Sequence, residues 1–274
     1  MNIMKKLIIV EHRAHEFANR LLSDISIYAY ALEIGARVID LSFFENNRIL
    51  GWLHALCAWG IDKFSRGTSG LWALGGPKVL PPSDTLPPAL EAQNTLYFFG
   101  WLFINPVGLE KYRLQILKAF APRKSLQRKI DAILTSLPQH RVRIGVSLRL
   151  LPFKGFGDGE FLVPPERVRE IVGEYLHEKN LRAQDVVLVI ACDQAPPSEI
   201  FEGYTTVVSH ESPEMSLYLL SKCNVVVGTN TTLSNTAAWF GSIPHIVSKK
   251  EPIDWSYYHG KETYFENKYA NFMQ

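Results

Sequence analysis

The stretch CNVVVGTNTTLSNTAAWFG, residues 223–241, decides how the second half of this chain folds. Its run at 224–227, which contains three consecutive valines, predicts a short buried strand, and the apolar residues from Leu233 onward predict a helix. Hydroxyl and amide side chains lie between the two, together with closely spaced backbone N–H groups. Because a helix N-terminus carries N–H groups without helical acceptors and a partial positive charge, the stretch predicts a strand–loop–helix unit that binds an anion, such as a diphosphate.

Alternating strand and helix patterns continue through the second half of the chain. Apolar, β-branched runs predict strands at 142–150, 186–191, 205–208 and 244–247. Helical periodicity predicts helices at 164–177 and 214–222, the first with a proline at its start. Strands that alternate with helices predict a parallel, doubly wound sheet, so the expected fold class is α/β.

The first half shows the same alternation with one interruption. A strand at 7–10, a helix at 17–34 that stops at Gly35 and a strand at 36–43 predict a βαβ unit. Further helices are predicted at 45–60, 109–120 and 125–137, and a further strand at 95–99. Residues 64–94 are rich in glycine and proline and predict a long irregular loop. Long loops in compact domains are often functional, so this one could shape a binding site for an acceptor substrate. We expect an N-terminal α/β domain at 1–125 and a C-terminal Rossmann-like domain at 126–274.

Composition narrows the classes of partner. The 274 residues have a formal net charge of +2, from 29 basic and 27 acidic residues. This balance gives no strongly basic surface, so no nucleic-acid partner is expected. The three cysteines include no CxxC pair, which predicts free thiols in a reducing, cytoplasmic compartment. No Cys/His cluster has the spacing of zinc ligands, so we expect neither a metal nor a cofactor.

One apolar segment bears on membrane contact. No run reaches the roughly 18 apolar residues that a membrane-spanning helix needs. Residues 50–61 are apolar and contain two tryptophans, which predicts a core helix. A weak contact of that segment with a membrane surface stays open as an alternative, and with it a peripheral location.

Three polar side chains predict one site at the edge of the sheet. Ligands of doubly wound sheets bind at the carboxyl ends of the strands. Arg149, Asp193 and Asn230 each fall at or just past a predicted strand end, and Arg149 would neutralise a departing diphosphate. The phosphates would be held by side chains and backbone N–H groups of Asn230, Thr231, Thr232, Leu233 and Ser234. The alternative for Arg149 is a salt bridge at the protein surface. The alternative for the loop residues is that they only cap the N-terminus of the helix.

A nucleotide sugar is a ligand with such a diphosphate, and it can act as the donor of its sugar to a hydroxyl of an acceptor. Further side chains are candidates for roles around this ligand. Asp193 would bind ribose hydroxyls or the base edge, or else form a turn after its strand. Asp158 lies in a glycine-rich loop that would close over the donor, or else forms an ordinary turn. His15 or Glu16, just after the first strand, would be the general base that takes the proton of an acceptor hydroxyl, with solvated charge as the alternative. His245, between a proline and an isoleucine, is expected to pack in the core.

Several of these residues lie in motifs that resemble those of a known family. The segment from Asn230 to Gly241 resembles Asn-Ser-Ser/Thr-Phe-Ser-Trp-Trp-Ala-Ala-Trp-Leu-Gly of the α-1,2-fucosyltransferases, and residues 219–223, LLSKC, are similar to that family's Leu-Met-Ser-x-Cys. Weaker similarities follow in the family's order, with FANRLL at 17–22, VSLR at 146–149 and VIACD at 189–193. By this resemblance, Asn19 would orient the donor sugar or the acceptor.

The resemblance implies the GT-B architecture of two Rossmann-like domains with parallel sheets flanked by helices. The N-terminal domain would lie on the acceptor side, and the C-terminal domain would bind GDP-fucose. Inversion at the anomeric carbon without an essential metal is also implied. The chain departs from the family's motifs where Ser147 replaces a histidine, Leu150 an arginine, and Asn235 and Thr236 two tryptophans. Glu16 and Ala18 also replace two glycines of the N-terminal motif, and the motif's Gly-Asp pair appears only later, as Gly157-Asp158.

The expected function is the transfer of fucose from GDP-fucose to a hydroxyl of a glycan acceptor. The departures from the motifs leave two other functions open. One is a GT-B enzyme, or an epimerase, that uses a different nucleotide sugar. The other is a protein that binds a nucleotide or a sugar without catalysis.

Overall fold

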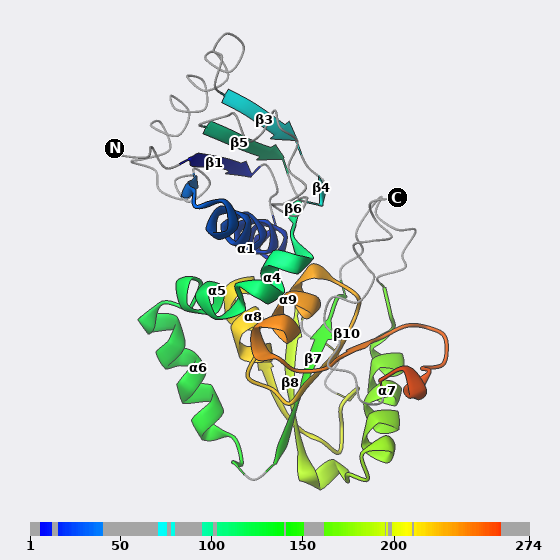
Figure 1. The fold of residues 1–274 in the computed structure, drawn as a ribbon. Coiled ribbons are helices and arrows are strands. Elements are labelled where there is room, and N and C mark those ends of the chain that lie inside the picture. Colours follow the sequence, from blue (N-terminus) through cyan, green and yellow to red (C-terminus); the bar gives the residue numbers. More distant parts are fainter. Residues whose placement is uncertain are drawn as a thin grey trace. The chain divides into compact units, whose positions relative to one another are not determined.

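The computed structural model describes residues 6–12, 16–40, 71–75, 78–79, 95–100, 103–139, 141–150, 162–194, 196, 199–209 and 211–258 (Figure 1). The chain divides into two compact units, the first ending at Ala121 and the second beginning at Pro122. The predicted helix at 45–60, the apolar segment 50–61 and the side chains of His15 and Asp158 lie outside the described residues.

The first unit contains a parallel four-stranded sheet. Its strands are β1 (Leu7–His12), β2 (Arg37–Asp40), β3 (Leu71–Gly75) and β5 (Thr95–Gly100), in the order β2-β1-β5-β3. A second, two-stranded sheet pairs β4 (Lys78–Val79) with β6 (Phe103–Ile104). The predicted strands at 7–10 and 95–99 are confirmed, each with a short extension at its C-terminal end.

Helix α1 (Phe17–Ile34) covers one face of this sheet, as predicted from its apolar periodicity. Ile27, Tyr30 and Ala31 are buried against strand residues that include Ile8 and Phe98. The buried hydroxyl of Ser23 accepts a hydrogen bond of 3.1 Å from the backbone N–H of Phe103, which ties α1 to β6. The helix ends at Gly35, whose left-handed backbone (φ 67°) confirms the predicted C-cap.

Two predictions for the first unit are wrong. The segment 109–120 is not one helix but two, α4 (Pro106–Lys111) and α5 (Arg113–Ala119), with a break at Tyr112. The first begins earlier than expected because Asn105 Oδ1 accepts a hydrogen bond from the N–H of Gly108 and caps it. The segment 64–94 is not one irregular loop, since β3 and β4 lie within it and β3 completes the sheet beside β5.

The second unit contains a parallel five-stranded sheet. The strands are β7 (Val142–Leu148), β8 (Val186–Cys192), β9 (Thr205–Ser209), β10 (Val225–Gly228) and β11 (His245–Val247), in the order β11-β10-β7-β8-β9. Its helices are α6 (Lys124–Ser136), α7 (Pro165–Glu178), α8 (Pro213–Leu220) and α9 (Thr232–Gly241), with short 3₁₀ turns η4 (Ala183–Asp185) and η5 (Trp255–Tyr258). The predicted doubly wound arrangement of parallel strands and helices is therefore confirmed.

Helices cover both faces of the second sheet (Figure 1). On one face, α7 buries Val168, Ile171 and Val172 against strand residues that include Val225 and Val227. On the other face lie α8 and α9, where the Leu220 side chain approaches Gly145 of β7. Because both faces are covered, β8 and β10 are continuous apolar runs rather than alternating ones.

The segment 219–241, which carries the strongest family resemblance, is a packing unit that joins α8 to α9. A Cβ atom at Gly241 would collide with the backbone carbonyl of Ser221, so the two helices approach more closely there than a side chain would allow. Trp239 of α9 is fully buried. Much of the motif therefore serves to hold α9, and the loop in front of it, in a fixed position on the sheet.

No helix in the described part of the chain has both the length and the hydropathy that a bilayer crossing requires.

Candidate functional site

Three neighbouring strands of the second sheet end together and bring the predicted residues to one edge. Leu148 at the end of β7 pairs with Cys192 of β8, and Ser147 pairs with Gly228 of β10. Arg149 and Asp193 directly follow the first two strands, and the loop with Asn230 follows the third. The carboxyl edge predicted from the sequence therefore does collect these three residues, with the arginine on the central strand of the three.

The loop from Gly228 to Thr231 is tight. A Cβ atom at Gly228 would lie 2.7 Å from Ser147 Cβ and 2.9 Å from its carbonyl oxygen, so only glycine fits there. The N–H of Thr231 donates to the carbonyl of Thr229 at 2.6 Å, which turns the chain around Asn230. Thr229 is 2% exposed, and its hydroxyl has no hydrogen-bond partner among the described residues. A buried donor of this kind is costly to leave unsatisfied, which suits a site that a ligand completes.

The N-terminus of α9 points its positive end into this loop. Thr231 is the N-cap, and its Oγ1 accepts a hydrogen bond of 3.3 Å from the N–H of Ser234. No aspartate or glutamate lies in the first turn of the helix, so no carboxylate of that turn offsets the helix dipole. Thr231, Thr232 and Leu233 are half-buried. The predicted cap and the predicted anion site therefore coincide at these residues.

Ser234 has a different position from the one predicted for a ligand contact. Its side chain is fully buried, and its Oγ lies 3.0 Å from Thr231 Oγ1. The hydroxyl is thus engaged in holding the cap. Any contribution of Ser234 to a ligand would pass through Thr231.

Asp193 supports the backbone that follows β7. Its Oδ1 accepts a hydrogen bond of 2.8 Å from the N–H of Leu150, the residue after Arg149. The side chain is exposed, so its carboxylate is also accessible. Burial, and to a lesser extent the negative charge of Asp193, raise the pKa of the neighbouring Cys192 thiol.

A buried polar contact lies beside the loop, and the sequence patterns did not predict it. Asn235 donates through Nδ2 to Asn230 Oδ1 at 3.0 Å and to the carbonyl of Thr231 at 2.9 Å. Its Oδ1 lies 3.0 Å from Nδ1 of His245. His245 is buried, as expected for a core residue, but it belongs to this polar cluster. The only sequence signal is the presence of Asn235 where the resembled family has tryptophan.

The remaining predicted residues belong to the first unit or lie outside the described residues. Glu16 is the N-cap residue of α1, and its exposed carboxylate makes no capping hydrogen bond. Asn19 is half-buried in the first turn of that helix. His15 and Asp158 have no described position, so their roles stay predictions.

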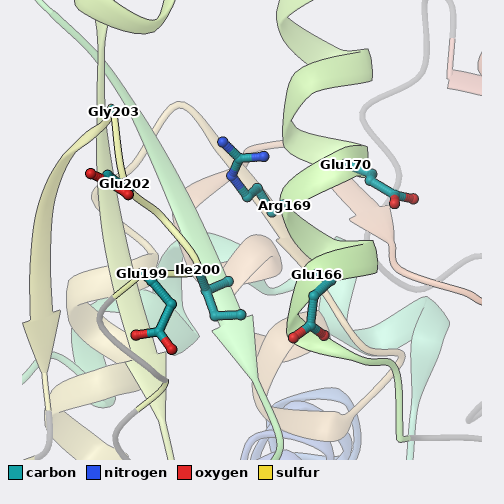
Figure 2. A pocket seen from close by; sticks show the side chains of 7 residues that line it. All are labelled: Glu166, Arg169, Glu170, Glu199, Ile200, Glu202 and Gly203. Atoms are coloured by element: carbon teal, nitrogen blue, oxygen red, sulfur yellow. The ribbon is translucent and has the colours of Figure 1, made fainter.

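Among the described residues, no metal-ligand group lies at this edge, and a depression of the second unit lies elsewhere. No group of three or more His, Cys, Asp or Glu residues in the described ranges could hold a metal ion. A depression of about 560 Å³ lies between α7 and the turn before β9 (Figure 2). It is lined by Glu166, Arg169, Glu170, Glu199, Ile200, Glu202 and Gly203. Four carboxylates against one guanidinium make that depression unsuitable for a diphosphate.

Comparisons with known proteins bear on the fold. The sequence matches no family model and no curated protein. The structure is similar to a mutant of Arabidopsis thaliana FUT1 in complex with GDP, at 13% identity over 90% of this chain and 71% of that chain, with a TM-score of 0.53. It is also similar to the fucosyltransferase NodZ from Bradyrhizobium, at 15% identity over 85% of this chain and 93% of that chain, with a TM-score of 0.52. A third similar structure is POFUT1 in complex with GDP-fucose, at 10% identity over 89% of this chain and 98% of that chain, with a TM-score of 0.52.

At these identities the likeness concerns the fold. The predicted fold class, α/β with parallel sheets flanked by helices, is confirmed, and the chain has the fold of these GT-B fucosyltransferases.

Proposed function

We propose that this chain is a glycosyltransferase that uses a nucleoside diphosphate sugar, and that the donor binds at the carboxyl edge of the unit beginning at Pro122. The observation that carries the proposal is the pairing of Ser147 with Gly228. This register sets Arg149, which follows β7, beside the loop that leads to the N-terminus of α9. A guanidinium and a helix N-terminus on adjacent strands form a site for a diphosphate.

The chemistry follows from the leaving group. An acceptor hydroxyl attacks the anomeric carbon, the bond from that carbon to the diphosphate oxygen breaks, and the nucleoside diphosphate departs with the bonding electrons. Arg149 and the dipole of α9 stabilise the negative charge that develops on the diphosphate. Attack from the side opposite the leaving group inverts the configuration of the anomeric carbon. Arg149 and the α9 dipole stabilise the departing diphosphate in place of a metal ion.

GDP-fucose is the donor that we propose. The resemblance of residues 219–241 to α-1,2-fucosyltransferases supports it, and so does the fold shared with fucosyltransferases whose structures contain GDP or GDP-fucose. Asp193 would contact the ribose or the base, and Asp158 would close over the donor. The acceptor would be a glycan bound by the unit that ends at Ala121.

For the proton of the acceptor hydroxyl, we propose His15 or Glu16 as general base. The carboxylate of Glu16 is exposed and does not cap α1, and a carboxylate in such a position can take a proton from a bound hydroxyl. Asn19, in the first turn of the same helix, would orient the sugar or the acceptor. Substitutions of these residues should therefore be assayed by the rate of sugar transfer rather than by the affinity for the donor.

One observation favours a second candidate, a GT-B enzyme that uses another nucleotide sugar. Leu150 stands where the resembled motif has an arginine, and its side chain packs against the hydrophobic core of the second unit. The site therefore has one cation fewer than that motif provides. If the arginine of the motif selects the sugar, its replacement by Leu150 would lead to a donor other than GDP-fucose.

A donor panel tests the proposal. The protein is incubated with GDP-fucose, GDP-mannose or UDP-glucose and a mixture of glycans, with and without EDTA, and products are identified by mass spectrometry. Fucose transfer that is insensitive to EDTA and lost in Arg149→Ala is the expected result. Transfer from another donor supports the second candidate, an isomerised nucleotide sugar indicates an epimerase, and binding without any product indicates a non-catalytic protein.

A further inference from the structure

The buried side chain of Asn235 connects the donor loop to β11. Asn235 is 4% exposed and lies in α9, whereas His245, at 1% exposed, begins β11. Two hydrogen bonds join this pair to the loop, from Asn235 Nδ2 to Asn230 Oδ1 and from Asn235 Nδ2 to the Thr231 carbonyl, and a third, between Asn235 Oδ1 and His245 Nδ1, joins the two residues to each other. The cluster therefore reaches from the interior of the unit to a half-buried residue of the candidate site.

The carbonyl of Thr231 determines how the Asn235 amide is oriented. A backbone carbonyl can only accept, so the amide atom 2.9 Å from it must be the NH₂ group. The oxygen of Asn235 then faces His245 Nδ1, which must carry a proton in order to donate to it. The orientation thus follows from one fixed acceptor rather than from the choice of rotamer alone.

The same reasoning extends to Asn230. The second N–H of the Asn235 amide points at Asn230, 3.0 Å away, so the atom that receives it must be the Asn230 oxygen. The two branches of an amide point in different directions. What Asn230 retains for a ligand is therefore its NH₂ group, which donates hydrogen bonds and so suits an anion, an acceptor.

We infer that Asn235 and His245 are positioning residues of the donor site, which hold the Asn230 side chain so that it presents a hydrogen-bond donor to the diphosphate. This inference rests on the proposed function and adds the part of the site that selects for negative charge. Without Asn235, the amide of Asn230 can rotate and present its oxygen, which repels a phosphate oxygen.

The test measures the binding of GDP and of guanosine to four proteins by titration calorimetry. They are the wild type, Asn235→Leu, Asn230→Ala and the double variant. Leucine resembles asparagine in size but makes none of the three hydrogen bonds. We expect Asn235→Leu to bind GDP about tenfold more weakly, the effect of one hydrogen bond to a charged group, and guanosine with unchanged affinity.

The double variant separates positioning from a general loss of structure. If Asn235 acts through Asn230, the double variant binds GDP no more weakly than Asn230→Ala alone. Additive losses, or GDP affinity in Asn235→Leu equal to that of the wild type, would overturn the inference. Val168→Ala, in the core of the same unit at 0% exposure, is the matched control, since it lowers stability and should leave GDP affinity unchanged.

Two further results keep the outcomes distinct. If Asn235→Leu does not fold, His245→Phe and His245→Gln replace it, because the first removes the donor to Asn235 and the second retains one. Weaker GDP binding in the phenylalanine variant and its recovery in the glutamine variant support the inference, and equal binding in both contradicts it. A wild-type chain that binds no nucleoside diphosphate contradicts the proposed function itself and this inference with it.

Discussion

The backbone N–H of Leu150 donates a 2.8 Å hydrogen bond to Oδ1 of Asp193, and this bond joins the ends of β7 and β8. Arg149 lies between β7 and Leu150, so the bond holds the segment of backbone that carries the proposed cation. A carboxylate predicted to contact the ligand therefore also supports the residue beside it.

Asp193 can be tested with two variants. Asp193→Asn retains an oxygen that accepts from Leu150, so we expect it to bind GDP within about twofold of the wild type. Asp193→Ala lacks the acceptor, and we expect about three- to tenfold weaker binding, the value of one ordinary hydrogen bond. Titration calorimetry measures both. An equal loss in the two variants would show instead that the negative charge of Asp193 is what matters.

The N-cap of α9 provides a second prediction. Thr231→Ala removes the acceptor for the N–H of Ser234 and should lower the free energy of unfolding by about 1 kcal/mol, while Thr231→Ser should be close to the wild type. The alanine variant should also bind GDP more weakly. Urea unfolding and calorimetry measure the two effects.

Ser212→Ala is the matched control for that cap. Ser212 caps α8 through a 3.2 Å hydrogen bond from the N–H of Met215, so its loss should cost a similar free energy of unfolding. GDP binding should be unaffected, because Ser212 caps α8, whereas the helix whose N-terminus faces the donor loop is α9, capped by Thr231. Equal weakening of GDP binding by the two cap variants would indicate a loss of stability rather than of a binding group.

Glycine positions give a prediction about stability alone. Gly228→Ala places a methyl group 2.7 Å from Ser147 Cβ and 2.9 Å from a backbone oxygen, and should destabilise the protein by about 1–3 kcal/mol. At Gly173, within α7, an added Cβ atom would lie more than 4 Å from any neighbouring side chain of the described residues, and alanine should stabilise the helix there by about 1 kcal/mol. Thermal unfolding of both variants decides whether the close contact at Gly228 exists.

The buried thiol of Cys223 predicts a loss of stability at alkaline pH. Burial raises the pKa of Cys223 to about 12, although Arg143 acts in the opposite direction. In the unfolded state the thiol has a pKa of about 8.5, so above that pH the unfolded state loses a proton that the folded state keeps. The free energy of unfolding therefore falls as pH rises from about 8.5 toward 12.

Cys223→Ala tests this account of the thiol. Urea unfolding of the variant between about pH 8 and 10 should show a shallower decline than that of the wild type. The upper limit avoids the tyrosines, since burial raises the pKa of Tyr30 and of Tyr218 to about 12 and both would add to the decline above about pH 10. Parallel declines in the two proteins would contradict burial of this thiol.

Much of the fold could be predicted because its signals are local. The helix at Phe17–Ile34 and the strands of the second sheet are apolar runs whose period distinguishes helix from strand. The break at Tyr112 has no proline or glycine to mark it, and β3 is surrounded by residues typical of loops. Strand β3 forms by pairing with β5, a segment distant in the sequence, and local pattern does not contain that contact.

The candidate site divides in the same way. Arg149, Asp193 and Asn230 could be placed together because parallel strands end at one edge. The contact between Asn235 and His245 could not, since it arises only where β11 pairs with β10 and brings His245 opposite Val226. Nor could the burial of Ser234, whose position follows from which side of α9 packs on the sheet.

The central claim is that a nucleoside diphosphate binds at this edge through its phosphates, and calorimetric titration tests it most directly. The titrations use GDP, UDP, ADP and guanosine with the wild type and with Arg149→Ala. The account predicts that GDP binds, that guanosine binds far more weakly, and that Arg149→Ala weakens GDP binding about tenfold or more while remaining folded. GDP affinity unchanged in Arg149→Ala, or no binding of any nucleotide, would contradict it.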